Sequence, residues 1–199
     1  MSEAIAATEL ILGGQKSGKS RRAERLARDW LARSDAHCGL LIATAQPCDD
    51  EMRQRIARHQ SDRAARVPGL HTLEVPLDLA AAITCHGGAD TLLVVDCLTL
   101  WLTNWTMPMD DVVQDLEQKK AQVLAWQAQS ALFFEAIAQA PGPVVLVGNE
   151  IGLGVIPLGR EVRAFVDALG LLNQQAARVC QRVTLMAAGL PLTLKEPCP

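Results

Sequence analysis

The chain has 199 residues, of which 49% are hydrophobic and 21% charged, and its formal net charge is -3. This size and balance predict one globular domain with a substantial buried core, and the slight negative charge argues against binding to nucleic acid regardless of its sequence. No apolar run approaches the roughly 20 residues that cross a bilayer, and no basic segment followed by an apolar one opens the chain. We therefore expect a cytoplasmic protein whose partner is a small molecule.

Strand-like and helix-like segments alternate along the chain. Residues 1–8 predict a flexible leader, and 9–199 a single domain. Apolar runs predict strands at 9–12, 39–43, 91–96, 144–148, 182–187 and 190–194. Helices are predicted at 18–33, 49–63, 77–83, from 110 to about 139, and at 160–180. The alternation is typical of an α/β fold, a mostly parallel sheet flanked by helices.

The first predicted strand and helix are joined by the sequence GGQKSGKS, which has the spacing G-x-x-x-x-G-K-[ST] of a P-loop. In such a loop, backbone N–H groups and the following helix N-terminus surround the phosphates of a nucleoside triphosphate. Lys19 would reach the β- and γ-phosphates, and Ser20 would bind Mg²⁺. A glycine-rich turn with an incidental lysine is the alternative, and the flanking strand and helix disfavour it. The predicted phosphate-binding residues are Gly13, Gly14, Gln15, Lys16, Ser17, Gly18, Lys19 and Ser20.

Asp96 ends the predicted strand 91–96 directly after four apolar residues. Because ligands bind at the carboxyl ends of parallel strands, this carboxylate is placed to bind Mg²⁺ or a water of its hydration shell. The alternative is that Asp96 caps a helix that begins at Cys97. The P-loop favours the metal.

A second acidic strand end follows 144–148, where Asn149 and Glu150 precede a loop with Gly152 and Gly154. The glycines would permit close approach to a ligand, or a mobile lid, but a simple crossover loop explains them equally well. The residues alone leave both possibilities open.

His59 shares a helical stripe with Met52, Ile56 and Arg63. A histidine at the edge of the core would fit this spacing, and the spacing alone favours it. The alternative is a nucleophile, because a neutral imidazole can attack phosphorus and hold a nucleotidyl group as a phosphoramidate.

Several of these segments together resemble one family, the bifunctional adenosylcobinamide kinase and adenosylcobinamide-phosphate guanylyltransferase of cobalamin biosynthesis. The matching blocks lie at 13–20, 42–46, 49–59, 95–104 and 147–157. Many P-loop proteins share the first block. The block from Asp-Asp-Glu-Met to His59 and the block Asn-Glu-x-Gly-x-Gly-x-x-Pro are more specific.

The resemblance implies that His59 is the histidine that becomes guanylylated, which reverses the preference drawn from spacing. It also implies a GTP site that includes the P-loop. Its other residues would be Ala43, Thr44, Ala45, Gln60, Ser61, Asp62, Arg63, Glu74 and Asp96. Where the family often carries Trp-x-Thr-x-Glu, this chain has Leu-His-Thr-Leu-Glu at 70–74.

The implied reaction has two stages. ATP or GTP first phosphorylates adenosylcobinamide with the help of Lys19 and Mg²⁺. GMP then passes from GTP through His59 to adenosylcobinamide phosphate, which gives adenosylcobinamide-GDP and pyrophosphate. The resemblance further implies a RecA-like P-loop fold and a trimer. A P-loop small-molecule kinase without nucleotidyl transfer is the alternative. A switch-type GTPase is disfavoured because no Asn-Lys-x-Asp string occurs.

Overall fold

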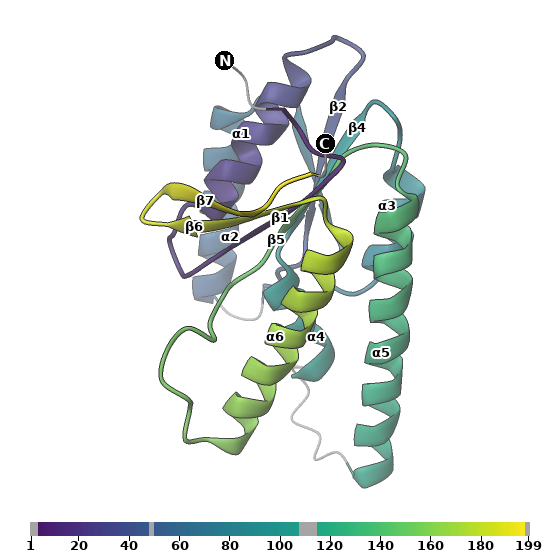
Figure 1. Ribbon diagram of the computed structural model, residues 1–199. Helices are drawn as coiled ribbons and strands as arrows, with labels where there is room; N and C mark the ends of the chain where they lie inside the picture. Colours follow the sequence, from purple (N-terminus) through teal and green to yellow (C-terminus); the bar gives the residue numbers. More distant parts are fainter. Residues whose placement is uncertain (1–3, 48–49, 108–114, 198–199) are drawn as a thin grey trace.

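The computed structural model describes residues 4–47, 50–107 and 115–197, without the side chains of residues 51, 52, 55, 56, 59 and 116. Its centre is a seven-stranded sheet of order β3-β2-β4-β5-β1-β6-β7 (Figure 1). The strands are β1 (Thr8–Gly13), β2 (Cys38–Ala43), β3 (Leu70–Glu74), β4 (Thr91–Asp96), β5 (Val144–Val147), β6 (Arg182–Ala187) and β7 (Leu190–Lys195). Only the β6–β7 pairing is antiparallel within this sheet.

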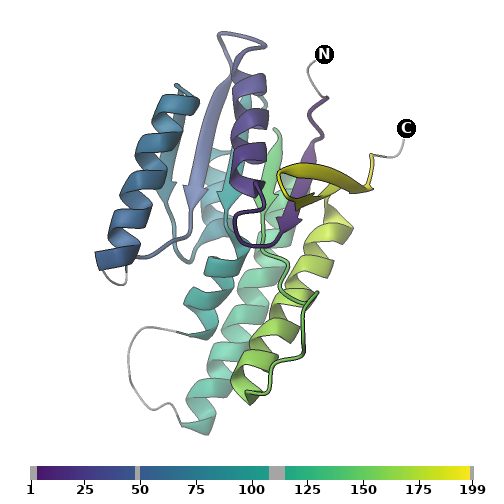
Figure 2. The same ribbon diagram turned by 90° about the vertical axis from the view of Figure 1, so that its left-hand side faces the viewer.

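The helices are α1 (Lys19–Leu31), α2 (Asp50–Arg66), α3 (Leu79–His86), α4 (Leu98–Thr106), α5 (Leu116–Gln139) and α6 (Arg160–Val179). They cover the two faces of the sheet, with α1 and α2 on one face (Figure 2). Alternate residues of each strand serve the two faces, as strand geometry requires. In β1, for example, Ile11 belongs to the cluster that packs against α1, and Leu10 to the cluster that packs against α3–α6.

The alternating α/β architecture predicted from the sequence is confirmed. Two elements were missed. Strand β3 has a single buried residue, Leu70, because it is an edge strand, so it shows no apolar run. Helix α4 was considered only as something that Asp96 might cap, and it proves to be a helix with Trp101 fully buried.

Several element boundaries differ from the predictions: α2 continues to Arg66, three residues beyond the predicted end, and α3 covers Leu79–His86 in place of 77–83. Helix α5 begins at Leu116, where Asp115 and Gln118 form a capping box, and residues 110–114 of the predicted helix lie outside the described residues. Strand β1 already includes Thr8, and Ala6 is 7% exposed, so the end of the predicted leader overlaps the fold. None of the described helices has the length and hydropathy needed to cross a membrane.

Candidate active site

The P-loop connects the last residue of β1 to the first residue of α1, and its backbone requires glycine at two positions. Gly13 has φ +153°, and a Cβ there would lie 2.5 Å from the carbonyl oxygen of Met186. Gly18 has φ +101° and precedes Lys19, the first residue of α1. The loop therefore turns sharply from strand to helix, which leaves its N–H groups at the carboxyl edge of the sheet.

The hairpin turn between β6 and β7 packs against this loop. The Gly189 N–H donates to the Ser17 carbonyl at 3.0 Å, and a Cβ on Gly18 would lie 3.3 Å from the Gly189 Cα. Ala188 and Gly189 both have positive φ, which is the geometry of a two-residue hairpin turn between β6 and β7. Sequence reasoning missed this support. The signal was available, because the two strands were predicted with little room between them.

Lys19 is 8% exposed, and its Nζ donates to the Gly14 carbonyl oxygen at 2.7 Å. Burial lowers the pKa of Lys19 below its usual value, and the acidic groups of Cys97 and Asp96 raise it to a lesser extent. The ammonium group is thus folded over the loop, within electrostatic range of the end of β4. This position suits a cation that contacts phosphate oxygens.

Thr44 fixes the chain around Asp96. Its N–H donates to the Asp96 carbonyl at 3.1 Å, and its hydroxyl both donates to the Cys97 carbonyl and accepts from the Cys97 N–H, each at 2.8 Å. Asn104 of α4 donates to the Thr44 carbonyl, also at 2.8 Å. Thr44 is fully buried. Its side chain therefore ties the end of β2 to the end of β4, while contact of Thr44 and its neighbours Ala43 and Ala45 with a nucleotide stays a prediction.

The predicted metal ligands are hard oxygen donors, the Ser20 hydroxyl and the Asp96 carboxylate. Ser20 is the second residue of α1, and Asp96 the last of β4. The described residues contain no group of three or more His, Cys, Asp or Glu that could hold a metal by themselves. Mg²⁺ in nucleotide sites uses one or two protein oxygens together with phosphate oxygens, so this pair fits that ion.

Residues predicted to follow the guanylylated histidine bind α2 to its neighbours. Gln60 donates to the Glu74 carboxylate of β3 at 3.1 Å. Arg63 is 8% exposed and donates to the Thr72 hydroxyl at 3.0 Å. The structure thus brings Gln60 and Glu74 together and directs Arg63 toward β3, which gives Arg63 a part in anchoring the helix.

Helix α2 is also tied to α1. Arg66 donates to both carboxylate oxygens of Glu24, at 2.8 and 3.0 Å, and Arg63 lies 3.9 Å from the same carboxylate. Ser61 and Asp62 are exposed on this helix, and Asp62 lies 3.8 Å from Arg66. The carboxyl-terminal half of α2 is therefore held on two sides.

His59 belongs to α2, one residue before Gln60. Its side chain lies outside the described part of the structure, so its backbone alone is placed. At 1.5 Å per residue, that backbone lies about 14 Å along the helix axis from Asp50. The role of His59 as nucleophile stays a prediction.

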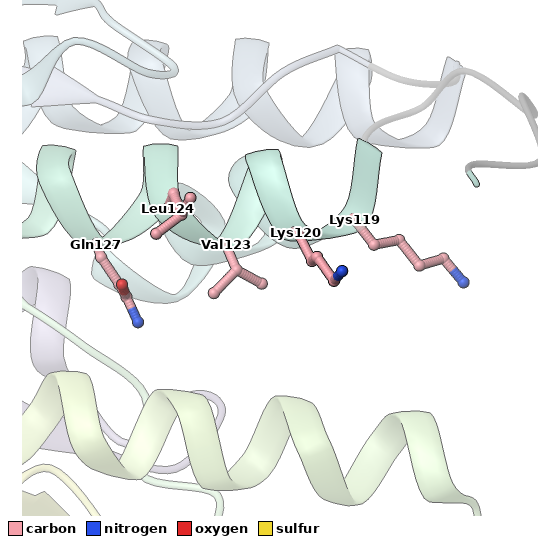
Figure 3. Close-up of a pocket in the computed structure, with 5 residues that line it drawn as sticks. All are labelled: Lys119, Lys120, Val123, Leu124 and Gln127. Atoms are coloured by element: carbon pink, nitrogen blue, oxygen red, sulfur yellow. The ribbon is translucent and has the colours of Figure 1, made fainter. Parts of the chain in front are cut away.

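A hollow of about 470 Å³ lies elsewhere on the molecule and is lined by α5 alone (Figure 3). Its lining residues are Lys119, Lys120, Val123, Leu124 and Gln127. None of the predicted site residues contributes to it.

Residues 9–194 match the family described as cobinamide kinase / cobinamide phosphate guanyltransferase. The chain belongs to this family. A bifunctional adenosylcobalamin biosynthesis protein CobP from Pseudomonas aeruginosa is 46% identical over 190 residues, which cover 94% of this chain and 96% of the relative. Proteins named CobU from Salmonella typhimurium and Escherichia coli are 35% and 34% identical, and each match covers 94% of this chain and 98% of the relative.

The fold has a more distant likeness among solved structures. The flagellar accessory protein FlaH from Methanocaldococcus jannaschii matches with a TM-score of 0.50 and 13% identity, over 97% of this chain and 80% of that chain. This likeness concerns the fold alone. It supports the P-loop fold class predicted for this cobinamide kinase / guanyltransferase family member.

The structure also places Asn149 and Glu150 at the same edge as the P-loop. The Glu150 N–H donates to the Gly13 carbonyl at 3.1 Å, and the Asn149 N–H donates to the Thr99 hydroxyl at 2.9 Å. Asn173 of α6 donates to the Asn149 carbonyl at 3.0 Å. The sequence could not decide between a ligand loop and a plain crossover here. In the structure, this segment of the family member lies between the P-loop and the helix that follows Asp96.

Proposed function

We propose that this protein phosphorylates adenosylcobinamide with ATP or GTP and then transfers GMP from GTP to the product, which yields adenosylcobinamide-GDP. Membership of the cobinamide kinase / cobinamide phosphate guanyltransferase family supports both activities. The observation that carries the proposal is the buried Lys19, folded over a glycine loop and near Asp96 at the adjoining sheet edge.

In the first reaction the substrate hydroxyl oxygen attacks the γ-phosphorus, and the bond from that phosphorus to the β-bridging oxygen breaks. The loop N–H groups and the N-terminus of α1 bind the phosphates, and Lys19 stabilises the charge that develops on the transferring group. Ser20 and Asp96 are the residues that would hold Mg²⁺. When bound, that ion would neutralise part of the negative charge on the phosphate oxygens.

In the second reaction the His59 imidazole attacks the α-phosphorus of GTP and pyrophosphate leaves. The phosphate of adenosylcobinamide phosphate then attacks the guanylyl group, and His59 is released. A covalent intermediate divides one transfer into two displacements. Gln60, Ser61, Asp62, Arg63 and Glu74 are proposed to contribute to the guanine nucleotide site. The proposal further includes a cytoplasmic location and a trimeric assembly, with no nucleic-acid partner.

The covalent step can be tested directly. The protein is incubated with GTP labelled at the α-phosphorus, denatured and subjected to acid and base. We expect protein-bound label that is lost in acid and retained in base, as a phosphoramidate requires. His59→Ala should abolish it, and the matched control His86→Ala, which changes an exposed histidine of α3, should retain it.

Two results would count against the proposal. Active protein without bound label would remove His59 as nucleophile. A His59→Ala protein that still transfers GMP at the normal rate would show that the transfer does not pass through His59.

A further inference from the structure

Strand β5 ends between the two parts of the phosphate site. In the sheet it lies between β1, which leads into the P-loop, and β4, which ends at Asp96. Val147, the last residue of β5, is paired with both Ile11 and Asp96. Glu150 therefore follows the strand that ends between the P-loop and Asp96 at the carboxyl edge of the sheet. None of the roles proposed above uses its carboxylate.

The backbone of Glu150 is fixed to the P-loop, because its N–H donates to the Gly13 carbonyl at 3.1 Å. Its carboxylate is also oriented. Oε1 accepts from the Gly152 N–H at 2.8 Å, and Oε2 lies 3.5 Å from Asn173 Nδ2. The Gly152 N–H thus holds one oxygen of the Glu150 carboxylate, and the other oxygen is less strongly bound.

Asn173 of α6 contacts the second oxygen of this carboxylate. It is 5% exposed, and its Nδ2 lies near two acceptors, the Asn149 carbonyl and the Glu150 carboxylate. Two acceptors identify the group that faces them as the amide NH₂. Its Oδ1 is buried and has no hydrogen-bond partner among the described residues. A buried amide with an unpaired oxygen is costly, which suggests that it is retained for its position.

We propose that Glu150 is the general base of the phosphorylation reaction, an inference that rests on the proposed function. Its carboxylate accepts the proton of the alcohol substrate as the oxygen of that hydroxyl bonds to the γ-phosphorus. The bond to the β-bridging oxygen breaks, its electron pair leaves with the nucleoside diphosphate, and protonated Glu150 afterwards releases the proton to water. Asn173 is a positioning residue that acts through Glu150.

The position of Glu150 bears on the direction from which the alcohol substrate approaches the γ-phosphorus. Helix α1 packs on the face opposite α6, and Glu150 contacts Asn173 of α6. With the nucleotide phosphates in the loop, the proposal has the alcohol approach the γ-phosphorus from the side where Glu150 lies. Glu150 is half-buried, which leaves it accessible to a substrate while its orientation is maintained.

The two reactions differ in their need for this base. An alcohol is a weak nucleophile until its proton is removed, and a positioned base accelerates such steps by about 10²–10⁴-fold. The nucleophiles of the guanylyl transfer are a neutral imidazole and an ionised phosphate, which have no proton to lose at the attacking atom. Loss of the Glu150 base should therefore impair phosphorylation selectively.

The test compares Glu150→Gln with the wild-type protein in two assays. Transfer of label from γ-labelled ATP to adenosylcobinamide should fall by about 100-fold or more. Guanylylation of the protein by α-labelled GTP, and GMP transfer to adenosylcobinamide phosphate supplied ready-made, should stay within about twofold. Glutamine keeps the size of the side chain, and its oxygen can accept from the Gly152 N–H; the contact that it gives up is the weaker one, at 3.5 Å from Asn173 Nδ2.

Glu135→Gln is the matched control, since it makes the same chemical change at an exposed position of α5. Glu150→Asp retains a carboxylate on a shorter side chain and should recover part of the lost phosphorylation rate. The Asp variant also keeps the idea testable if Glu150→Gln does not fold.

The outcomes separate the two levels of proposal. A wild-type protein that does not phosphorylate adenosylcobinamide contradicts the proposed function itself. Undiminished phosphorylation by Glu150→Gln in an otherwise active protein overturns only the role of Glu150. Equal losses in both reactions, or a Glu150→Asp variant no faster than Glu150→Gln, would show a structural role and also overturn it.

Discussion

Replacing Thr44 by valine tests whether its hydroxyl serves the architecture of the site. Valine has nearly the shape of threonine, so the change removes one hydroxyl from a fully buried position without opening a cavity. The Cys97 N–H then loses its acceptor. The Cys97 carbonyl keeps the Trp101 N–H, which donates to it at 3.1 Å.

The expected cost follows from these contacts. An unsatisfied buried N–H costs about 1–3 kcal/mol, and the lost second hydrogen bond adds about 0.5–1.5 kcal/mol. Thr44→Val should therefore reduce the free energy of unfolding by about 2–4 kcal/mol. For a domain of 150–250 residues, such a change lowers Tm by roughly 4–16 °C.

Urea unfolding measures this loss, with the midpoint expected to shift by about 1 M or more at unchanged slope. Thr44→Ser, which keeps the hydroxyl, is the matched control and should lose much less. Because the lost hydroxyl holds the backbone of Cys97, the residue directly after Asp96, phosphorylation by the folded Val variant should fall as well. A Val variant within 0.5 kcal/mol of wild type, or a Ser variant equally destabilised, would refute the reasoning.

The remaining predictions concern ionisable side chains in the site and in the core. Lys19→Met should reduce phosphorylation by about 100-fold or more while raising Tm, because burial disfavours the Lys19 charge and lowers its pKa; a lower Tm in a melting experiment would contradict this. Glu9→Gln should cost about 3–5 kcal/mol in urea unfolding, since it removes the charge that faces Arg22 at 2.8 Å in a buried pair, and adding Arg22→Met should restore part of the loss. Burial raises the pKa of Cys180 to about 12 from an ordinary value of 9.0, so stability should decline as pH rises above about 9, where the unfolded chain loses that proton first. Iodoacetamide at pH 8.5 followed by peptide mass analysis should accordingly modify exposed Cys38 long before Cys180.

The parts of the molecule that could be predicted from sequence are those that depend on local rules. The P-loop was recognisable because Gly13 and Gly18 answer a requirement of the backbone itself, and their φ values of +153° and +101° show that requirement. The central strands β1, β4 and β5 were recognisable by continuous apolar runs, because both of their faces are covered. Asp96 could be placed at the site because every parallel strand presents its carboxyl end to the same edge.

The remaining features depend on contacts between distant parts of the chain. The pairing of Thr44 with Cys97 spans 53 residues, and that of Asn173 with Asn149 spans 24. No local pattern signals which threonine or asparagine will be used in this way. Strand β3 was missed for a related reason, because its place in the fold comes from pairing with β2 and from Arg63 of α2.

The order of the strands has a consequence for the two proposed reactions. The P-loop, Asp96 and Glu150 belong to β1, β4 and β5, which are neighbours, whereas Glu74 and the contacts of α2 belong to β3 at the far edge. Four strand spacings separate β1 from β3, or about 19 Å. In the proposed arrangement, a GTP molecule with its terminal phosphates in the P-loop extends its nucleoside end across β5, β4 and β2 to reach Glu74. The same arrangement would bring the γ-phosphorus to the end of β5, where Glu150 follows, and the α-phosphorus closer to α2, the helix that carries His59. We therefore expect one loop to serve both reactions, with the γ-phosphorus approached from the end of β5 and the α-phosphorus from α2.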